Sequence, residues 1–136
     1  SVKTIDDFSF SGCLSLQSVV IPNSVKTIGF SAFNKCESLQ SVIIPDSVEI
    51  ISEYAFRRCL SLQSVIIPNS VKIIGNFAFT CCKSLQSVII PNSVETIEEY
   101  SFEGCKMIKY LTIPKHLEKK IKKSKVLSKH RSVIYV

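Results

Sequence analysis

The sequence has little of what marks membrane spans or processing signals. It contains no tryptophan, one methionine, two histidines and four glycines in 136 residues. Its longest apolar runs, such as residues 42–44, are only three or four residues long, far short of the roughly 20 needed to span a bilayer. The sequence shows no N-terminal apolar region with a basic lead, and it opens on Ser1 in mid-pattern. We expect no transmembrane segment, and we expect that any targeting segment was removed or never included.

The groups that catalysis or metal binding requires do not converge in the sequence. The two histidines, His116 and His130, have no nucleophile and carboxylate placed beside them as a catalytic triad requires. The glycines stand singly and do not form a phosphate-binding loop. Since no Cys-x-x-Cys spacing occurs, a zinc site is not indicated. We therefore expect no enzymatic activity, no cofactor and no bound metal.

Charge is distributed unevenly along the chain. The formal net charge is +6. Residues 1–114 have a net charge of −1, whereas residues 115–136 have a net charge of +7. The basic character therefore belongs to the C-terminal part and not to the body of the protein.

What the sequence does contain is an internal repeat. The blocks 1–23, 24–46, 47–69, 70–92 and 93–115 align without a gap, which gives a period of 23 residues. In the second block the recurring positions are Val25, Ile28, Ala32, Phe33, Cys36, Leu39, Val42, Ile44 and Pro45. Because these positions are mostly apolar and return in every block, they predict the core.

Each block contains two local patterns. Residues 39–44 read Leu-x-x-Val-x-Ile and end in the alternation of a half-buried strand. The following Pro45 lacks an amide donor and begins a turn. Earlier in the block, Ile28, Phe33 and Cys36 are spaced to line one face of a helix of about two turns. The residues expected to cap these helices are Asp6, Gly29, Ser52, Gly75 and Glu98.

A strand that returns every 23 residues after a long crossover pairs in parallel with its predecessor, and such crossovers are right-handed. We therefore predict an α/β solenoid, right-handed and curved into a horseshoe arc. It has a parallel β-sheet on one side and short helices on the other, so that equivalent side chains stack into ladders. Residues 1–115 supply five repeats. Residues 116–136 are expected to form a degenerate sixth repeat that acts as a basic C-terminal cap.

The repeat resembles a known class. Leu-x-x-Val-x-Ile-Pro followed by Ala-Phe-x-x-Cys is similar to the BspA-like leucine-rich repeats of surface proteins in anaerobic bacteria and parasitic protists. The resemblance covers residues 1–115 and implies a leucine-rich-repeat solenoid. It also implies a cell-surface or secreted protein that acts in adhesion or host-protein binding, with a cytoplasmic or nuclear location as the alternative. It does not identify a ligand.

Most of the cysteines follow the repeat. The five that fall on the period are Cys13, Cys36, Cys59, Cys82 and Cys105. Since cysteine behaves as a small buried hydrophobe, the simplest interpretation is a ladder of free thiols in the core. Neighbouring rungs fall within disulfide reach, but an odd number leaves one thiol unpaired. Cys81 is the sixth, and we expect it to be the most exposed.

The residues between the core positions of each strand must face outward. The predicted protein-binding face consists of Gln40, Ser41, Ile43, Gln63, Ser64, Ile66, Gln86, Ser87, Ile89, Tyr110 and Thr112. One interpretation is that β-branched residues simply suit a strand. The other is a docking surface for an extended or repetitive protein, or for another copy of the same sheet. Positions near the expected helices, such as Asn34 and Arg57, vary between blocks and are an alternative place for selective recognition.

The basic C-terminal segment provides a second candidate site. Its lysines are Lys119, Lys120, Lys122, Lys123 and Lys125. The simplest interpretation is a solvated cap that keeps the end of the solenoid soluble. The alternative is a polyanion site for nucleic acid or an anionic membrane. No aromatic residues interrupt this stretch to stack on bases.

The N-terminal block begins abruptly without a polar cap. Val2, Ile5 and Phe10 are core positions of that block, so we expect apolar surface to be bare at this end of the solenoid. The sequence predicts that this end continues into further repeats or pairs with another chain.

Overall fold

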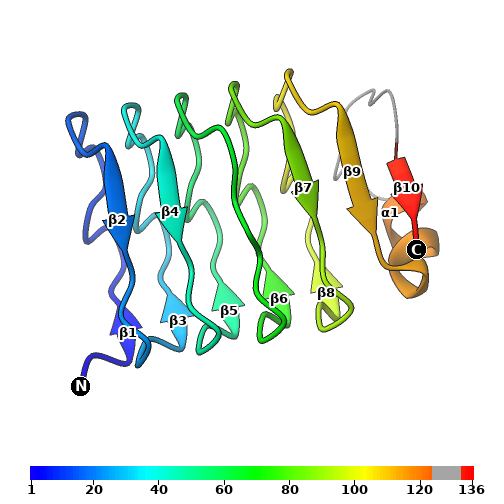
Figure 1. The fold of residues 1–136 in the computed structure, drawn as a ribbon, viewed down its shortest axis with the longest axis horizontal. Helices are drawn as coiled ribbons and strands as arrows, with labels where there is room; N and C mark the ends of the chain where they lie inside the picture. The colour runs from blue at the N-terminus through cyan, green and yellow to red at the C-terminus, as the bar shows by residue number, and fades with distance from the viewer. Residues whose placement is uncertain (124–132) are drawn as a thin grey trace.

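The computed structural model describes residues 1–123 and 133–136 and shows a solenoid. Its coils lie side by side in chain order, with the two termini at opposite ends of the row (Figure 1). Parallel strands pair at the register that the repeat predicts, for example Val19 with Val42. The predicted solenoid with a parallel sheet along one side is therefore confirmed.

Strands form along two sides of the solenoid, where the sequence predicted a sheet on one side only. The first sheet has the order β1-β3-β5-β6-β8 and is built from two-residue strands. These strands are β1 (Thr4–Ile5), β3 (Thr27–Ile28), β5 (Ile50–Ile51), β6 (Ile73–Ile74) and β8 (Thr96–Ile97). Ile28 was expected on a helix and lies instead in β3. The capping positions that precede the expected helices follow these strands; the amide of Gly29, for example, donates to the carbonyl of Ile5 at 2.8 Å.

The second sheet uses the predicted Leu-x-x-Val-x-Ile segments. Its strands are β2 (Ser18–Val20), β4 (Ser41–Ile43), β7 (Ser87–Ile89), β9 (Tyr110–Ile113) and β10 (Val133–Tyr135). β2 pairs with β4, and β7, β9 and β10 pair in a separate group. In the third coil only Ser64 forms a bridge, to Ser87, and Figure 1 shows no arrow between β4 and β7. The strand pattern is therefore present in every coil, but the hydrogen-bonded ladder is interrupted at the third.

The crossovers consist of successive turns, so the prediction of a short helix in each repeat is wrong. In the second coil the amides of Ala32, Asn34 and Cys36 donate to carbonyls three residues earlier. The amides of Ser31, Phe33 and Lys35 donate to the next coil. An α-helix needs every amide for bonds within the segment, so this alternation prevents it. Ser31 and Lys35 also have positive φ values of 53° and 59°, which end a right-handed helix.

The same two turn positions have positive φ in other coils. Non-glycine residues with positive φ are Phe8, Ser31, Lys35, Tyr54, Arg58, Phe77, Cys81 and Tyr100. Gly12 and Gly104 have φ values of 75° and 73° and occupy the repeat position of Lys35. Glycine at this position was a sequence signal for the left-handed conformation, and it was missed.

The predicted core is confirmed from the second to the fifth coil. Ala32, Phe33, Cys36 and Leu39 have no exposed surface, and their counterparts in the next two coils are buried in the same way. The first coil is more open, since Phe10 is 38% exposed whereas Phe33 is fully buried. The proline turns also form as predicted: the Pro45 carbonyl accepts a bond from the Val48 amide at 3.1 Å.

The C-terminal end departs from the repeat. A short 3-10 helix, η1 (Lys115–Leu117), leads into α1 (Glu118–Lys123), and among the described residues these are the only helices. Leu117 and Ile121 are buried and belong to the core cluster. β10 pairs in parallel with β9, with Val133 opposite Leu111. These contacts support the interpretation of residues 116–136 as a modified sixth coil and cap, which stays a prediction.

Candidate functional site

The outer sheet face is the surface formed by the exposed residues of the second sheet. Along it an apolar column is strongly exposed: Val20 by 72%, Ile43 by 63%, Ile66 by 81% and Ile89 by 67%. The alternate residues point inward, and Val42, Val65 and Val88 are at most 7% exposed. The sequence therefore predicted correctly that these aliphatic side chains are exposed in the first four coils.

The polar members of this face lie beside the apolar column. Gln40, Gln63 and Gln86 are exposed, as are Ser41, Ser64 and Ser87. In the fifth coil the columns change character, because Tyr110 is 58% exposed while Thr112 is half-buried. The uniform part of the face thus runs over the first four coils and ends at an aromatic side chain.

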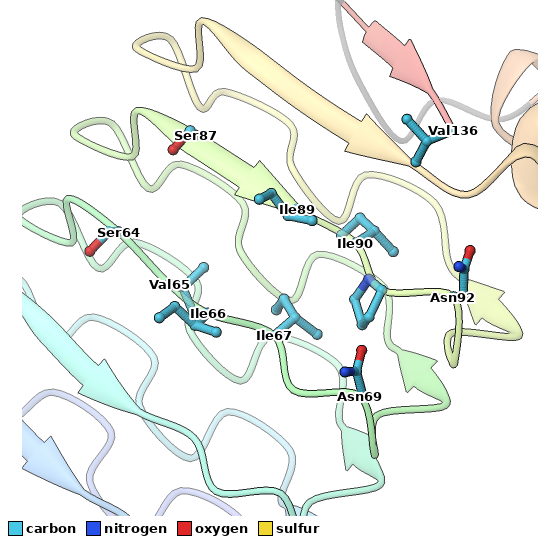
Figure 2. A pocket seen from close by; sticks show the side chains of 11 residues that line it. Ser64, Val65, Ile66, Ile67, Asn69, Ser87, Ile89, Ile90, Asn92 and Val136 are labelled. Carbon is cyan, nitrogen blue, oxygen red and sulfur yellow. The ribbon is translucent and has the colours of Figure 1, made fainter.

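A hollow of about 440 Å³ lies on this face between the third and fourth coils. Figure 2 shows Ile66 and Ile89 along it, with Asn69 and Asn92 toward the proline turns that follow these segments and Val136 beyond β9. The hollow coincides with the interruption of the ladder after Ser64. Its exposed lining is mostly aliphatic, with serine and asparagine side chains around it, so it suits an apolar side chain flanked by hydrogen-bonding groups.

The buried thiol ladder is confirmed for four of its five predicted members, those of the second to fifth coils. All six cysteines are free. Cys36, Cys59, Cys82 and Cys105 are buried, and their Sγ atoms donate to phenylalanine carbonyls one coil back at 3.1 to 3.3 Å. Burial raises the pKa of the Cys36 thiol to about 12 and also raises that of Cys82, so both stay protonated near neutral pH. They are structural groups and not nucleophiles.

The expectation for the most exposed cysteine is wrong. Cys13 is exposed, whereas Cys81 is only half-buried. Cys13 lies in the coil at one end of the described stack, while Cys81 packs close to Gly104 of the next coil. Position along the stack therefore decides exposure here more than position within the repeat.

The side of the solenoid formed by the crossovers, which we call the turn side, carries a column of aromatic side chains. In the sequence most of these residues stood out only as a position that varies between blocks. This outer aromatic column consists of Phe8, Phe30, Tyr54, Phe77 and Tyr100, whose successive ring centroids are 4.9 to 5.5 Å apart. Four members share one repeat position. In the second coil that position is the buried Ser31, and the neighbouring Phe30 fills the column instead. The continuity of the column depends on packing between coils.

The predicted polyanion site is only partly described. Lys119 and Lys120 are exposed on α1. Lys122 and Lys123 also belong to α1, and Lys125 lies outside the described residues. The polyanion site therefore stays a prediction.

Among the residues that the structure describes, no group of three or more His, Cys, Asp or Glu side chains is placed to hold a metal ion. Over the same residues, no helix has the length and apolar character needed to cross a membrane.

Comparison with known proteins gives a consistent result. Residues 3–128 match the model of the BspA type leucine rich repeat region in six copies. Among solved structures, the chain is similar to a leucine-rich repeat protein of T. pallidum, TpLRR, with 35% identity over 82% of this chain and 52% of that one, at a TM-score of 0.80. No match was found among curated proteins.

Two further solved structures are similar. A leucine-rich cell surface protein of Faecalibacterium prausnitzii is 34% identical over 81% of this chain and 29% of that one, at a TM-score of 0.78. A leucine-rich repeat protein of Bacteroides ovatus is 31% identical over 85% of this chain and 36% of that one, at a TM-score of 0.62. The chain therefore spans between about a third and a half of the length of these neighbours.

Proposed function

This chain belongs to the BspA type of leucine-rich-repeat family, and from that premise we propose that it is a non-enzymatic module that binds a protein through its outer sheet face. The observation that carries the proposal is the unbroken series of exposed aliphatic side chains along that face. Val20, Ile43, Ile66 and Ile89 lie at equivalent positions of successive coils and are each at least 63% exposed. A contiguous apolar patch on a protein surface usually marks an interaction site.

The energetics favour a partner that covers several coils. Complete burial of an exposed isoleucine side chain contributes about 1.5–3 kcal/mol. A contact with Ile66 alone is therefore weak, and simultaneous contact with Ile43, Ile66 and Ile89 is needed to offset the entropy lost on association. The serine and glutamine side chains beside this column supply hydrogen bonds at its border, as in other protein interfaces.

The uniformity of the face supports an extended or repetitive partner. Strands of neighbouring coils lie about 4.8 Å apart, so a segment running along the solenoid meets the same chemistry at each step. The hollow between Ile66 and Ile89 adds one position where a partner side chain inserts more deeply. An extended partner segment gains from both features, because it contacts many coils and anchors at one of them.

We also propose that this binding serves attachment at a cell surface, with a host protein as partner. The support is the family and the similarity to the leucine-rich cell surface protein of Faecalibacterium prausnitzii. The sheet face needs to be accessible for such a role, and the exposure of Ile43 and Ile89 meets that requirement.

A cell-binding assay tests both parts of the proposal. Beads coated with the chain are applied to epithelial cell layers, and the triple variant Ile43→Glu, Ile66→Glu and Ile89→Glu is compared with the unchanged chain. We expect the number of bound beads to fall at least about 10-fold for the triple variant, since each new carboxylate opposes burial in the interface. The matched control is Ile73→Glu, because Ile73 is exposed on the other sheet, in β6.

Two arms separate this proposal from its alternatives. Treating the cells with trypsin should remove binding if the ligand is a protein. Replacing Lys119 and Lys120 with glutamine should leave binding unchanged at physiological salt. If the triple variant binds normally while the lysine variant loses binding, the polyanion function replaces the present one.

Self-association through the N-terminal coil is a second candidate contact. Val2, Phe8 and Leu14 are each at least 57% exposed in this coil. Pairing two such ends buries these side chains, so sedimentation should show a concentration-dependent dimer that Leu14→Lys weakens. A monomer of the unchanged chain at millimolar concentration contradicts this contact.

A further inference from the structure

A second hollow lies on the turn side of the solenoid, away from the outer sheet face. It has a volume of about 390 Å³ and is lined by side chains of the second, third and fourth coils. The lining residues that matter for its chemistry are Phe30, Asn34, Tyr54, Arg57, Phe77 and Thr80. Aromatic, amide, guanidinium and hydroxyl groups therefore converge in one place that the proposed protein-binding function does not use.

Phe30 differs from the other rings of the outer aromatic column in its orientation. Tyr54 and Phe77 stack with an interplanar angle of 15°, so their facing surfaces cover each other. The ring of Phe30 is turned by 88° from that of Tyr54 and by 68° from that of Phe8. Its two faces therefore point sideways from the column and not along it. Phe30 is half-buried, so part of its ring is accessible to a ligand in the hollow.

Arg57 is held in the hollow without a negative partner. Its guanidinium carbon lies 5.6 Å from the centre of the Tyr54 ring, a cation–π contact that restrains the side chain. The two ion pairs found among the described residues are Lys26 with Glu49 and Arg58 with Glu37, so neither involves Arg57. A restrained guanidinium with free N–H groups is suited to a carboxylate, which it binds with two parallel hydrogen bonds.

Asn34 provides an unused hydrogen-bond acceptor. Its Oδ1 atom is buried and has no hydrogen-bond partner in the structure. A buried polar atom without a partner costs about 1–3 kcal/mol. A hydroxyl group brought into the hollow, combined with a small rotation of the amide, would relieve that cost. The hollow therefore suits a ligand with a hydrogen-bond donor near Asn34 and a negatively charged acceptor near Arg57.

We propose that this hollow binds an acidic sugar residue, a pyranose that carries a carboxylate. The carboxylate pairs with Arg57, a ring hydroxyl donates to Asn34 Oδ1, and the C–H face of the sugar packs on the accessible face of Phe30. Phosphate or an acidic peptide side chain satisfies Arg57 but offers no ring to Phe30. A neutral sugar satisfies Phe30 and Asn34 but leaves the guanidinium without a charged partner. The acidic sugar is the ligand class that uses all three side chains.

The direct test is an NMR titration of the isotope-labelled chain with methyl glucuronide, with methyl glucoside as the matched neutral sugar. With the glucuronide we expect chemical-shift changes at Phe30, Asn34 and Arg57. The glucoside should bind at least about 10-fold more weakly than the glucuronide. Arg57→Gln should weaken glucuronide binding by the same factor. Phe30→Leu should weaken glucuronide binding by about 3- to 10-fold, since it removes the ring face.

Arg58→Gln is the matched control, since Arg58 carries the same charge one residue away and pairs with Glu37. This variant should bind the glucuronide within about 2-fold of the unchanged chain, because Arg58 does not line the hollow. Equal affinity for the two sugars, or equal losses in the two arginine variants, overturns the proposal. Unchanged far-ultraviolet circular dichroism shows that each variant is folded.

The result is independent of the protein-binding proposal. The triple variant of Ile43, Ile66 and Ile89 should bind the glucuronide like the unchanged chain, since these residues lie on the outer sheet face and do not line this hollow. Inorganic phosphate provides the remaining arm. If phosphate shifts the same resonances with equal or higher affinity, the hollow is a general anion site and the sugar assignment is wrong.

Discussion

The turn side of the solenoid carries two aromatic columns, and the same coils build both of them differently. The inner column consists of Phe10, Phe33, Phe56, Phe79 and Phe102. Its rings are 5.1 to 5.2 Å apart, its interplanar angles are at most 8°, and each member occupies the same repeat position. The outer column has similar spacing, but its rings are partly exposed and one of them comes from a shifted position.

Burial explains the difference between the columns. Phe33 and Phe56 are surrounded by the core, where a shifted ring would leave a cavity or a clash. The outer rings have solvent on one side, so Phe30 can replace Ser31 as the aromatic member and turn on edge. Identity along the solenoid is therefore enforced inside the coils, and variation that can serve recognition is confined to the surface.

The largest expected effect compares the two columns within one coil. Phe56→Ala should destabilise the protein by about 3–5 kcal/mol, because it opens a cavity at a fully buried position. Tyr54→Ala removes a half-exposed ring and should cost about 1 kcal/mol. Urea unfolding followed by circular dichroism measures both. Equal losses would show that the outer column is as much a part of the core as the inner one.

The second prediction concerns the thiols that bond to the inner column. The Cys36 thiol donates to the Phe10 carbonyl at 3.1 Å, and burial raises its pKa from 9.0 to about 12. The unfolded chain therefore loses this proton at lower pH than the folded chain. Stability should be complete below about pH 9 and fall as the pH rises toward 12, by up to about 4 kcal/mol for one such thiol.

Urea unfolding at pH values from about 8 to 11, in steps of about one unit, measures this dependence. Cys36→Ala should make the decline shallower and leave in place the part that comes from Cys82, whose pKa burial also raises. A variant that declines as steeply as the unchanged chain contradicts the assignment of the effect to this thiol.

A smaller effect tests the shifted ring of the outer column. Phe30→Ser should cost about 1 kcal/mol, since it interrupts contacts with Phe8 and Tyr54. Adding Ser31→Phe to this variant restores the regular repeat position. The double variant should recover most of the loss, because Tyr54 and Phe77 adopt positive φ at that position with aromatic side chains. Thermal unfolding of both variants measures this recovery. If the double variant is no more stable than Phe30→Ser, the second coil requires the ring at the shifted position.

The last prediction, of similar size, concerns the positive-φ turn position of the crossovers. Lys35 has a φ of 59°, and glycine occupies the same repeat position at Gly12 and Gly104. Lys35→Gly should be more stable than Lys35→Ala by about 1 kcal/mol, since a side chain at positive φ is strained. Comparing the melting temperatures of the two variants measures the difference. Greater stability of the alanine variant would show that the turn relaxes out of the left-handed conformation.

Much of the fold was predictable because the repeat is regular. The positions of Phe33, Cys36 and Leu39 within each block were sufficient to predict a buried ladder. The exposure of Ile43 and Ile66 followed from strand alternation. The helices were not correctly predicted, since the spacing of Ile28, Phe33 and Cys36 also fits a chain of turns, and periodicity alone does not distinguish the two.

Of the two candidate sites, one was predictable from the sequence and the other was not. The outer sheet face was predictable residue by residue, because each member depends only on its place in a strand. The hollow around Arg57 was not, because it combines three coils and depends on the orientation of Phe30 and on the unpaired oxygen of Asn34. Side chains that lie 23 residues apart in sequence become neighbours only when the coils stack.

The sequence by itself determined the period, the core positions and the exposed aliphatic column, since these follow from the alternation and recurrence of apolar residues. Only the tertiary structure decided where the backbone amides donate. In the first four crossovers, every second amide bonds to the next coil, and these segments form turns with positive φ values. That choice depends on a neighbouring coil being present, so no single repeat encodes it.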